Sequence, residues 1–242
     1  MLQKIHLIPK FSDIIVLHGL CVIEGVYHIF FLYSKDTKKR WGHFSTKDFL
    51  HYDFSSGEAE GVICKPCNRY FFANTTGEKL MMELIKSPQS KRKCFFSLPK
   101  KVVFDGETML QYPAPQLSEL RQYRRNVKLK SGENADTFGG VFEAILTFTE
   151  DNYEILLRDD ITIRCENNSI SVTHQGLCQS FNSEDSKHLH IFSDISSVEI
   201  FTGGKVLSVP AFPNEKGTVT VLCGECRAEI YNLKNIEVSF LN

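Results

Sequence analysis

Two pairs of cysteines have the spacing of metal ligands. Cys64 and Cys67 form one Cys-x-x-Cys pair, and Cys223 and Cys226 form a second. Each pair lies between two predicted strands, and a Cys-x-x-Cys on a hairpin turn can present two thiolates to one zinc ion. Two such turns would complete a tetrahedral site with four sulfur ligands, so the pattern suggests a structural zinc as cofactor. The alternative is two unrelated pairs of reduced thiols on turns.

Two carboxylates also lie close together in the sequence, at Glu58 and Glu60. In an extended segment they point to the same side, because alternate residues of a strand share a face. A pair of carboxylates can divide the roles of general acid and general base between them. Glu58 and Glu60 are therefore candidates for catalysis, and the alternative is a solvated strand edge.

The composition argues against several classes of partner. The chain of 242 residues has a net charge of −1, whereas nucleic-acid binding usually calls for a basic face. The apolar run Val26–Tyr33 is too short to span a bilayer, so no membrane partner is expected. Residues Met1–Cys21 include Lys10 and Asp13 and end in no cleavage site of small residues, so no secretory signal is expected. The cysteines are then expected to be reduced, and the predicted location is the cytoplasm.

The hydrophobic pattern is that of strands almost throughout. Short runs of β-branched and aromatic residues recur every 8–12 residues or so between turn signals, which predicts an all-β sandwich, barrel or propeller. Two stretches instead predict helices, Gly77–Lys86 and Ala114–Arg125. In the second, Leu117 and Leu120 repeat at helical spacing. The predicted strands are Gly19–Ile23, Tyr27–Tyr33, Arg69–Ala73, Phe142–Thr149, Glu154–Leu157, Ile161–Cys165, Ser169–Thr173, Leu189–Ser193, Ser197–Phe201, Val206–Val209, Thr218–Leu222 and Glu229–Asn232.

Three stretches of the chain match motifs of one enzyme family. The first is Gly19–Phe31 followed by Trp41–Tyr52, where a Gly-Leu strand leads to Tyr-His-Ile-Phe and then to Trp-Gly-His. The second, Phe96–Arg121, contains Leu-Pro-Lys-Lys and Gln-Tyr-Pro. The third, His190–Phe201, contains Asp-Ile-Ser-Ser-Val-Glu-Ile-Phe. In this order they resemble the family 32 glycoside hydrolases, which include invertases, levanases and sucrose-6-phosphate hydrolases.

The resemblance implies the remnant of a five-bladed β-propeller, joined by a short helix to a C-terminal β-sandwich. The implied domains are a truncated propeller segment over residues 1–112, a linker helix over 113–125 and a sandwich over 126–242. Between Ala73 and Phe95 the chain is too short to hold most of blades two to four, which the family carries there.

The resemblance also implies that the catalytic acids are missing. Family 32 hydrolysis retains configuration and needs one carboxylate as nucleophile and a second as acid/base. The family's nucleophile is the Asp of an Asn-Asp-Pro-Asn-Gly turn, and its position here holds Val16. Asp13 lies three residues away, a shift that the following strand cannot absorb without losing its pairing. The family's Arg-Asp-Pro and Glu-Cys motifs have no match.

Three residues match places where the family has structural or substrate-lining groups. Trp41, the single tryptophan, is a candidate for stacking on a sugar ring, with His43 and His18 beside it in the motif. The alternative for Trp41 is a buried aromatic anchor. For the histidines, His51 included, the alternatives are packing and a vestigial sugar contact, both favoured over metal binding.

Three hypotheses about function follow. The first is a non-catalytic relative that serves as a carbohydrate-recognition or protein-interaction module. Because two or so blades cannot close a ring, it predicts a homo-oligomer or a partner protein that covers the exposed propeller remnant. The second is a residual glycoside hydrolase that acts on fructosides or another sugar through Glu58 and Glu60. The third is a decayed gene product without selected activity.

Overall fold

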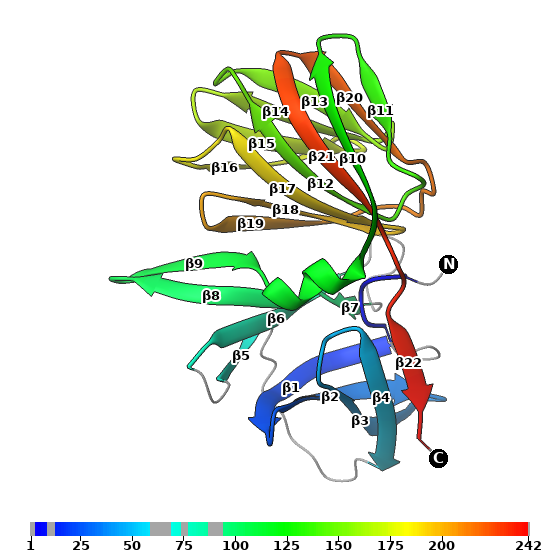
Figure 1. Cartoon of the computed structure of the whole chain (residues 1–242). Helices are drawn as coiled ribbons and strands as arrows, with labels where there is room; N and C mark the ends of the chain where they lie inside the picture. Colours follow the sequence, from blue (N-terminus) through cyan, green and yellow to red (C-terminus); the bar gives the residue numbers. More distant parts are fainter. Residues whose placement is uncertain (1–2, 9–12, 59–68, 74–76, 87–93, 242) are drawn as a thin grey trace. The chain divides into compact units, whose positions relative to one another are not determined.

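The structure is a computed structural model of the chain. Its regular elements are almost all β-strands, which confirms the predicted all-β class. The chain divides into two compact units, which are described separately. Leu2–Leu120 with Asn235–Asn242 form the N-terminal unit, and Arg121–Lys234 form the sandwich unit (Figure 1). The residues that the structure describes are 3–8, 13–58, 69–73, 77–86 and 94–241.

No helix in the described part of the chain is long and apolar enough to cross a membrane.

The first sheet of the N-terminal unit is a meander that the C-terminal strand extends. Its order is β1-β2-β3-β4-β22, and the first four strands pair antiparallel with their neighbours in the chain. Strand β22 runs parallel to β4, with Val238 opposite Tyr52. The chain end thus covers the backbone edge that β4 would otherwise expose. The bounds are β1 (Asp13–Ile23), β2 (Val26–Lys35), β3 (Lys38–Thr46), β4 (His51–Glu58) and β22 (Glu237–Phe240).

The second sheet of this unit has the order β5-β6-β8-β9, and β7 also pairs with β6. The helix predicted for Gly77–Lys86 is wrong, because this segment forms β6. Leu80, Met81 and Met82 are all buried, so the run shows no alternation, and periodicity alone cannot assign a short apolar run. The bounds are β5 (Arg69–Ala73), β6 (Lys79–Lys86), β7 (Cys94–Phe96), β8 (Lys100–Asp105) and β9 (Thr108–Pro113).

A glycine on β3 lets the core of the first sheet close. On β2, Tyr27, Ile29 and Phe31 are buried and point to one face, as alternate residues of a strand do. Phe31 pairs with Gly42, and a Cβ atom added at Gly42 would lie 2.3 Å from the Phe31 ring. The ring therefore packs over the glycine, a position that no larger residue could occupy without displacing it. Because successive residues of a strand point to opposite faces, His43, the next residue along β3, lies on the other face of the sheet.

The sandwich unit consists of two six-stranded antiparallel sheets. Their orders are β10-β21-β12-β17-β18-β19 and β11-β20-β13-β14-β15-β16. The bounds are β10 (Arg121–Lys130), β11 (Asn134–Asp136), β12 (Phe142–Phe148), β13 (Tyr153–Leu157), β14 (Ile161–Glu166), β15 (Ser169–His174), β16 (Leu177–Asn182), β17 (His188–Asp194), β18 (Ser197–Thr202), β19 (Lys205–Pro210), β20 (Thr218–Cys223) and β21 (Glu225–Leu233).

Residues from both sheets form one continuous core in the sandwich unit. Ile155 and Ile163 from one sheet belong to the same buried cluster as Leu146 and Ile191 from the other. Hairpins connect five pairs of consecutive strands, and positive φ angles are what two-residue hairpin loops need. Asn167 and Asn168 have φ angles of 51° and 61°. Asn167 and Asn168 therefore form the turn of the hairpin between β14 and β15.

The linker helix predicted over residues 113–125 is largely wrong. A single 3-10 helix, η1, covers Pro115–Leu120, with Leu117 and Leu120 buried. Strand β10 begins directly after it, and Arg121 pairs with Leu233 of β21. The i, i+3 spacing of the two leucines fits a 3-10 turn as well as an α-helix, and pairing with β21 determines the conformation of the residues that follow.

The expected C-terminal boundary also differs from the structure, because residues 235–242 belong to the N-terminal unit. The backbone N–H of Ile236 donates to the Lys4 carbonyl at 2.9 Å, and that of Glu237 donates to the Leu50 carbonyl at 2.8 Å. By its local pattern the segment resembles one more sandwich strand. Its partner, β4, is remote in sequence, and local pattern carries no signal for such a pairing.

Candidate functional site

One face of the first sheet carries a cluster of aromatic and imidazole rings. We call His18 of β1, His28 and Phe30 of β2, and Trp41 and His43 of β3 the histidine face. Strand alternation explains the members on β2 and β3, which alternate with buried positions of those strands, whereas His18 lies at an irregularity in the pairing of β1 with β2. Phe30 is exposed, and the other four side chains are partly exposed. The cluster is therefore accessible to a ligand.

Trp41 and His18 are in direct contact. Their ring centroids lie 4.7 Å apart at an interplanar angle of 70°, so the rings meet edge to face. Two strands supply the pair, because β1 and β3 flank β2 in the sheet. Neither ring is fully buried. An indole held in this way combines a fixed orientation with an accessible surface, which suits a ring that stacks on a ligand.

His28 and His43 form a hydrogen-bonded pair. Nδ1 of His28 lies 2.9 Å from Nε2 of His43, and the ring centroids are 5.1 Å apart at an angle of 10°. The nitrogens are thus much closer to each other than the ring centres are, so they face each other nearly in line. This geometry fits one N–H directed at one lone pair, and it leaves no room for a metal ion between the nitrogens. The pair therefore holds one proton between its two facing nitrogens.

Two further side chains complete the surroundings of His43. The Phe30 ring stacks on it with centroids 4.5 Å apart, and Oγ of Ser55 on β4 lies 3.3 Å from its Nδ1. Burial lowers the pKa of His43 below its ordinary value of 6.5, and the charge of a protonated His28 lowers it further. His43 is therefore neutral at pH 7. Both of its ring nitrogens are engaged, by His28 and by Ser55, and the partly exposed Ser55 hydroxyl has capacity for a further hydrogen bond to a ligand hydroxyl group.

The three sugar-contact candidates thus lie on one face, as residues of neighbouring strands. His51 does not join them. It is exposed, and its Nδ1 lies 2.7 Å from Oδ2 of Asp48. Burial opposes ionisation of Asp48, but hydrogen bonds from His51 and Leu50 outweigh it and lower the pKa of Asp48 to about 2. The Asp48–His51 pair stabilises the turn between β3 and β4.

Sequence reasoning missed His28, Phe30 and Ser55 as members of this cluster. Strand pairing could have identified two of them, because Phe30 is directly opposite His43 in the register and His43 is directly opposite Ser55. Assigning that register needs the length of the β2–β3 turn, where Asp36 and Thr37 have positive φ angles of 52° and 66°. Neither residue is a glycine, so the sequence contains little sign of the turn.

The position assigned to the catalytic nucleophile lies inside a strand. Val16 is 3% exposed and pairs with Leu32 of β2. Asp13 is the first residue of β1, opposite Ser34 in the register. Glu58 is exposed at the end of β4, opposite Arg40, and Glu60 lies outside the described residues. The catalytic role considered for Glu58 and Glu60 therefore stays a prediction.

The second cysteine pair lies where the chain passes from β20 to β21 at Gly224. These two strands belong to different sheets, so the hairpin turn expected at this pair is not present. Cys223 is exposed, whereas Cys226 is buried in the sandwich core. Burial raises the pKa of the Cys226 thiol to about 11, which opposes the thiolate form that zinc binds. Cys64 and Cys67 lie outside the described residues, so the shared zinc site stays a prediction. Within the described ranges no three His, Cys, Asp or Glu side chains are grouped to hold a metal ion.

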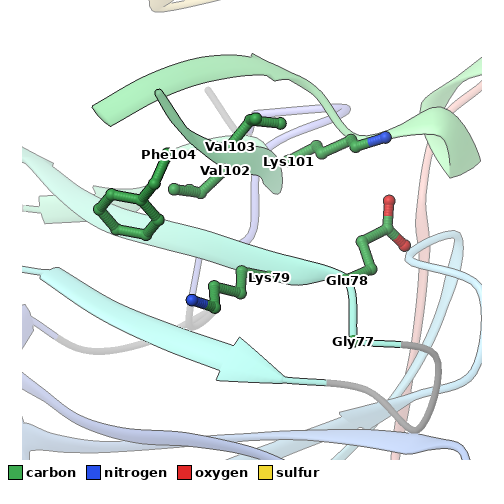
Figure 2. A pocket seen from close by; sticks show the side chains of 7 residues that line it. All are labelled: Gly77, Glu78, Lys79, Lys101, Val102, Val103 and Phe104. Atoms are coloured by element: carbon green, nitrogen blue, oxygen red, sulfur yellow. The ribbon is translucent and has the colours of Figure 1, made fainter. Parts of the chain in front are cut away.

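A pocket of about 540 Å³ lies on the second sheet of the N-terminal unit (Figure 2). The Lys79 ammonium lies over the Phe104 ring, 4.9 Å from its centroid. Among the described residues that line it, Glu78 is the one carboxylate, whereas a retaining glycosidase uses two. Its lining residues are Gly77, Glu78, Lys79, Lys101, Val102, Val103 and Phe104.

Comparisons with known proteins point to one fold. No protein-family model matches the chain. A sucrose-6-phosphate hydrolase from Vibrio alginolyticus is 39% identical over 51 residues, which is 19% of this chain and 10% of that protein. The matched segment is therefore a small part of the curated relative.

Solved structures match over nearly the whole chain. A GH32 β-fructofuranosidase from Bombyx mori aligns with a TM-score of 0.61 and 14% identity, over 96% of this chain and 68% of the enzyme. Fructan 1-exohydrolase IIa from Cichorium intybus aligns with a TM-score of 0.59 and 12% identity, over 97% of this chain and 75% of that enzyme. A fructofuranosidase from Schwanniomyces occidentalis aligns with a TM-score of 0.63 and 10% identity, over 96% of this chain and 98% of that protein. This chain therefore has the fold of the family 32 glycoside hydrolases, and the resemblance in its sequence is confirmed at the level of the fold.

Proposed function

We propose that this protein is a non-hydrolytic carbohydrate-binding member of the family 32 fold, and that sugar binds at the histidine face. The observation that carries the proposal is the buried Val16 in the middle of β1, at the position assigned to the nucleophile. An alkyl side chain cannot attack an anomeric carbon. The strand pairing around Val16 leaves no turn on which a carboxylate could be presented.

The carboxylates near the core of the N-terminal unit support the same proposal. A retaining glycosidase needs two carboxyl groups about 5 Å apart across the scissile bond. Oε1 of Glu83 accepts a hydrogen bond from the buried Lys100 ammonium at 2.6 Å, and Asp48 is held by the backbone of its own turn. Both groups are thus engaged in contacts that stabilise the fold.

Sugar recognition fits the chemistry of the histidine face. Carbohydrates offer apolar C–H faces and many hydroxyl groups, so their sites combine aromatic rings with hydrogen-bonding side chains. Trp41 and Phe30 supply the rings, His43 stacks on Phe30, and the Ser55 hydroxyl supplies an uncharged donor and acceptor. Because the structural neighbours include a β-fructofuranosidase and a fructan exohydrolase, fructose-containing sugars are the first ligands to test.

Calorimetric titration with sucrose and levan tests the proposal. The single tryptophan, Trp41, provides a second signal by fluorescence. We expect binding without release of fructose, and about tenfold weaker binding for Trp41→Leu and His43→Ala, because each removes a central contact. The matched control is His51→Ala, which removes a histidine of the same sheet outside the face and leaves affinity unchanged.

Hydrolysis would favour the residual glycosidase instead. If levan or sucrose were turned over, and if Glu60→Gln or Glu58→Gln abolished that turnover, the proposal of a non-hydrolytic protein would be wrong. If neither binding nor turnover occurred, the histidine face would be a packing feature of a scaffold or of a decayed gene product.

We also propose that a second copy of the chain covers exposed apolar residues of the N-terminal unit. Val103 and Phe104 of β8 and Tyr112 of β9 are exposed, although all three are large and apolar. Light scattering at micromolar concentration checks this point. A dimer that becomes monomeric on Phe104→Asp would support it, and a strictly monomeric wild-type protein would contradict it.

A further inference from the structure

Two aromatic side chains project from one place on the sandwich unit. Tyr123 on β10 is 71% exposed, and Phe138, which follows β11, is 49% exposed. Their ring centroids lie 6.5 Å apart at an angle of 46°. Much of each ring surface is in contact with water, so neither ring gains the full stabilisation that burial would give it. The pair therefore contributes little to the fold by packing.

Phe138 also has an unfavourable backbone conformation. Its φ angle is 62°, in the left-handed region that bulky residues rarely adopt. Asp136 supports this conformation, because its Oδ1 accepts a hydrogen bond from the Phe138 N–H at 2.9 Å. A glycine would take the same backbone shape without strain. Strain of this kind at an exposed side chain points to a role for the side chain itself.

The loop that presents Phe138 is tightly held. The backbone N–H of the buried Thr137 donates to the Gly217 carbonyl at 2.9 Å, and its hydroxyl donates to the Gly139 carbonyl at 3.0 Å. A Cβ atom added at Gly217 would lie 2.2 Å from the Gly139 carbonyl oxygen, and one at Gly140 would lie 2.6 Å from the Asn214 carbonyl oxygen. The two backbone segments therefore pack directly against each other. Phe138 is presented on a preorganised support, which reduces the entropy lost on binding.

Polar groups flank the two rings. Arg125, two residues after Tyr123 on β10, donates from Nη1 to the backbone carbonyl of Asp136 at 3.2 Å. This bond connects the strand that carries Tyr123 to the segment that leads into Phe138. The guanidinium is exposed and has further N–H groups that can donate to a ligand. Exposed rings and fixed donors thus occur side by side.

We propose that Tyr123 and Phe138 form a carbohydrate-binding platform for an oligosaccharide or polysaccharide chain. The apolar faces of sugar rings pack on aromatic rings, and two rings 6.5 Å apart can contact two neighbouring units of one chain. A protein partner fits the observations less well, because a stable protein interface buries about 800 Å² on each side, far more than two side chains supply. The platform lies on the sandwich unit and is independent of the histidine face.

Affinity electrophoresis of the full chain in gels that contain levan, inulin or soluble starch tests the platform. We expect at least one polymer to retard the wild-type protein, and Tyr123→Ala and Phe138→Ala each to weaken the affinity about tenfold. The control is Leu177→Ala, which removes an exposed apolar side chain at the start of β16 in the same unit and should change nothing. Trp41→Leu should also retain the retardation, which separates this site from the histidine face.

A second substitution keeps the test independent of folding. Phe138→Gly removes the ring and relieves the strained φ angle, so we expect a higher Tm together with lost retardation. Wild-type protein that no polymer retards would overturn the proposal. So would unchanged retardation of the Tyr123→Ala, Phe138→Ala double variant.

Discussion

The two units of this chain differ in how the sequence is assembled into sheets. The sandwich unit is one continuous segment, and short hairpins link five of its ten pairs of neighbouring strands, while the other five pairs join strands that do not follow each other in the chain. The N-terminal unit is made of two separate segments, and its first sheet is completed by the parallel strand β22 from the other end of the chain. Its strand β1 also contains two irregularities in its pairing with β2. Both units thus combine hairpins with remote strand pairings, but the first sheet of the N-terminal unit depends on a pairing between two separate segments of the chain.

This difference indicates where the chain has a free surface for binding. The described β1–β4 sheet carries Phe30 as an exposed ring beside partly exposed histidines, whereas the two inner faces of the sandwich form a closed apolar core. The candidate sites follow this division. One lies on an open sheet face, and the other lies on a loop at the surface of the sandwich unit. Because Trp41 is the single tryptophan, its fluorescence follows the N-terminal unit separately from the sandwich unit.

The largest effect is expected for Glu143→Ala in the sandwich unit. The buried Glu143 carboxylate accepts two hydrogen bonds of 2.6 Å from Arg121 and also contacts His190. Removing one partner of a buried ion pair leaves charge unpaired and costs about 3–5 kcal/mol. Hydrogen exchange of β12 should show this loss, with the Trp41 unfolding transition unchanged. The control Glu166→Ala breaks the exposed pair with Arg164 and should cost about 0–1 kcal/mol.

A smaller effect, located in the N-terminal unit, is expected for Gly42→Ala. The added methyl group would overlap the Phe31 ring, and overpacking of this kind costs about 1–3 kcal/mol. The denaturation midpoint of Trp41 fluorescence should fall, while exchange in the sandwich strands stays as in the wild type. Gly57→Ala is the matched control, because a Cβ atom added at Gly57 would meet nothing within 4 Å. Equal effects of the two substitutions would contradict the packing described for Phe31.

A third prediction concerns the parallel strand. The Phe240 ring meets the Phe54 ring edge to face, with centroids 5.5 Å apart, and such pairs contribute about 0.5–1.5 kcal/mol. Phe240→Ala should lower the stability measured by the Trp41 transition by that amount. Leu241→Ala, next to it and exposed, should have no comparable effect. If Phe240→Ala instead changed the hydrogen exchange of the sandwich strands, this would show that the chain end belongs to the sandwich unit.

The smallest effects are expected from pH. Burial lowers the pKa of His43 in the N-terminal unit and of His174 in the sandwich unit. Each group binds its proton more readily in the unfolded state, so its contribution to stability is full above the ordinary pKa of 6.5 and is lost as the pH falls below it. Asp160 opposes the shift at His174, and Arg158 adds to it. His43→Gln should flatten the pH dependence of the Trp41 transition alone, and His174→Gln that of sandwich exchange alone.

The sequence predicts nine of the twelve sandwich strands, because runs of β-branched and aromatic residues are a local signal. His190–Phe201 illustrates this, since such runs on either side of a turn form the paired strands β17 and β18. The predictions miss β10, β11 and β16, which bury few residues, and further errors fall where the pairing is remote or the apolar run is continuous. Strand β6 has three consecutive buried residues, and β22 pairs with β4 from the opposite end of the chain. Neither feature leaves a periodic pattern in its own segment.

The candidate site shows the same limit. Trp41, His43 and His18 are candidates implied by the family resemblance, and the structure places them on one sheet, while their role in sugar binding stays a prediction. The burial of Cys226 in the sandwich core has no signal in the Cys-x-x-Cys spacing, because spacing does not say which face a side chain takes. Phe138 is missed for a different reason, since no pattern marks a phenylalanine with a positive φ angle.

Sugar binding at the histidine face without hydrolysis is tested most directly by one assay. It follows fructose release from sucrose and levan over many hours, with binding measured on the same sample. We expect binding that depends on Trp41 and His43, and no release of fructose above the level of a Trp41→Leu control. Multiple turnovers of either sugar by the wild-type chain would contradict the proposal.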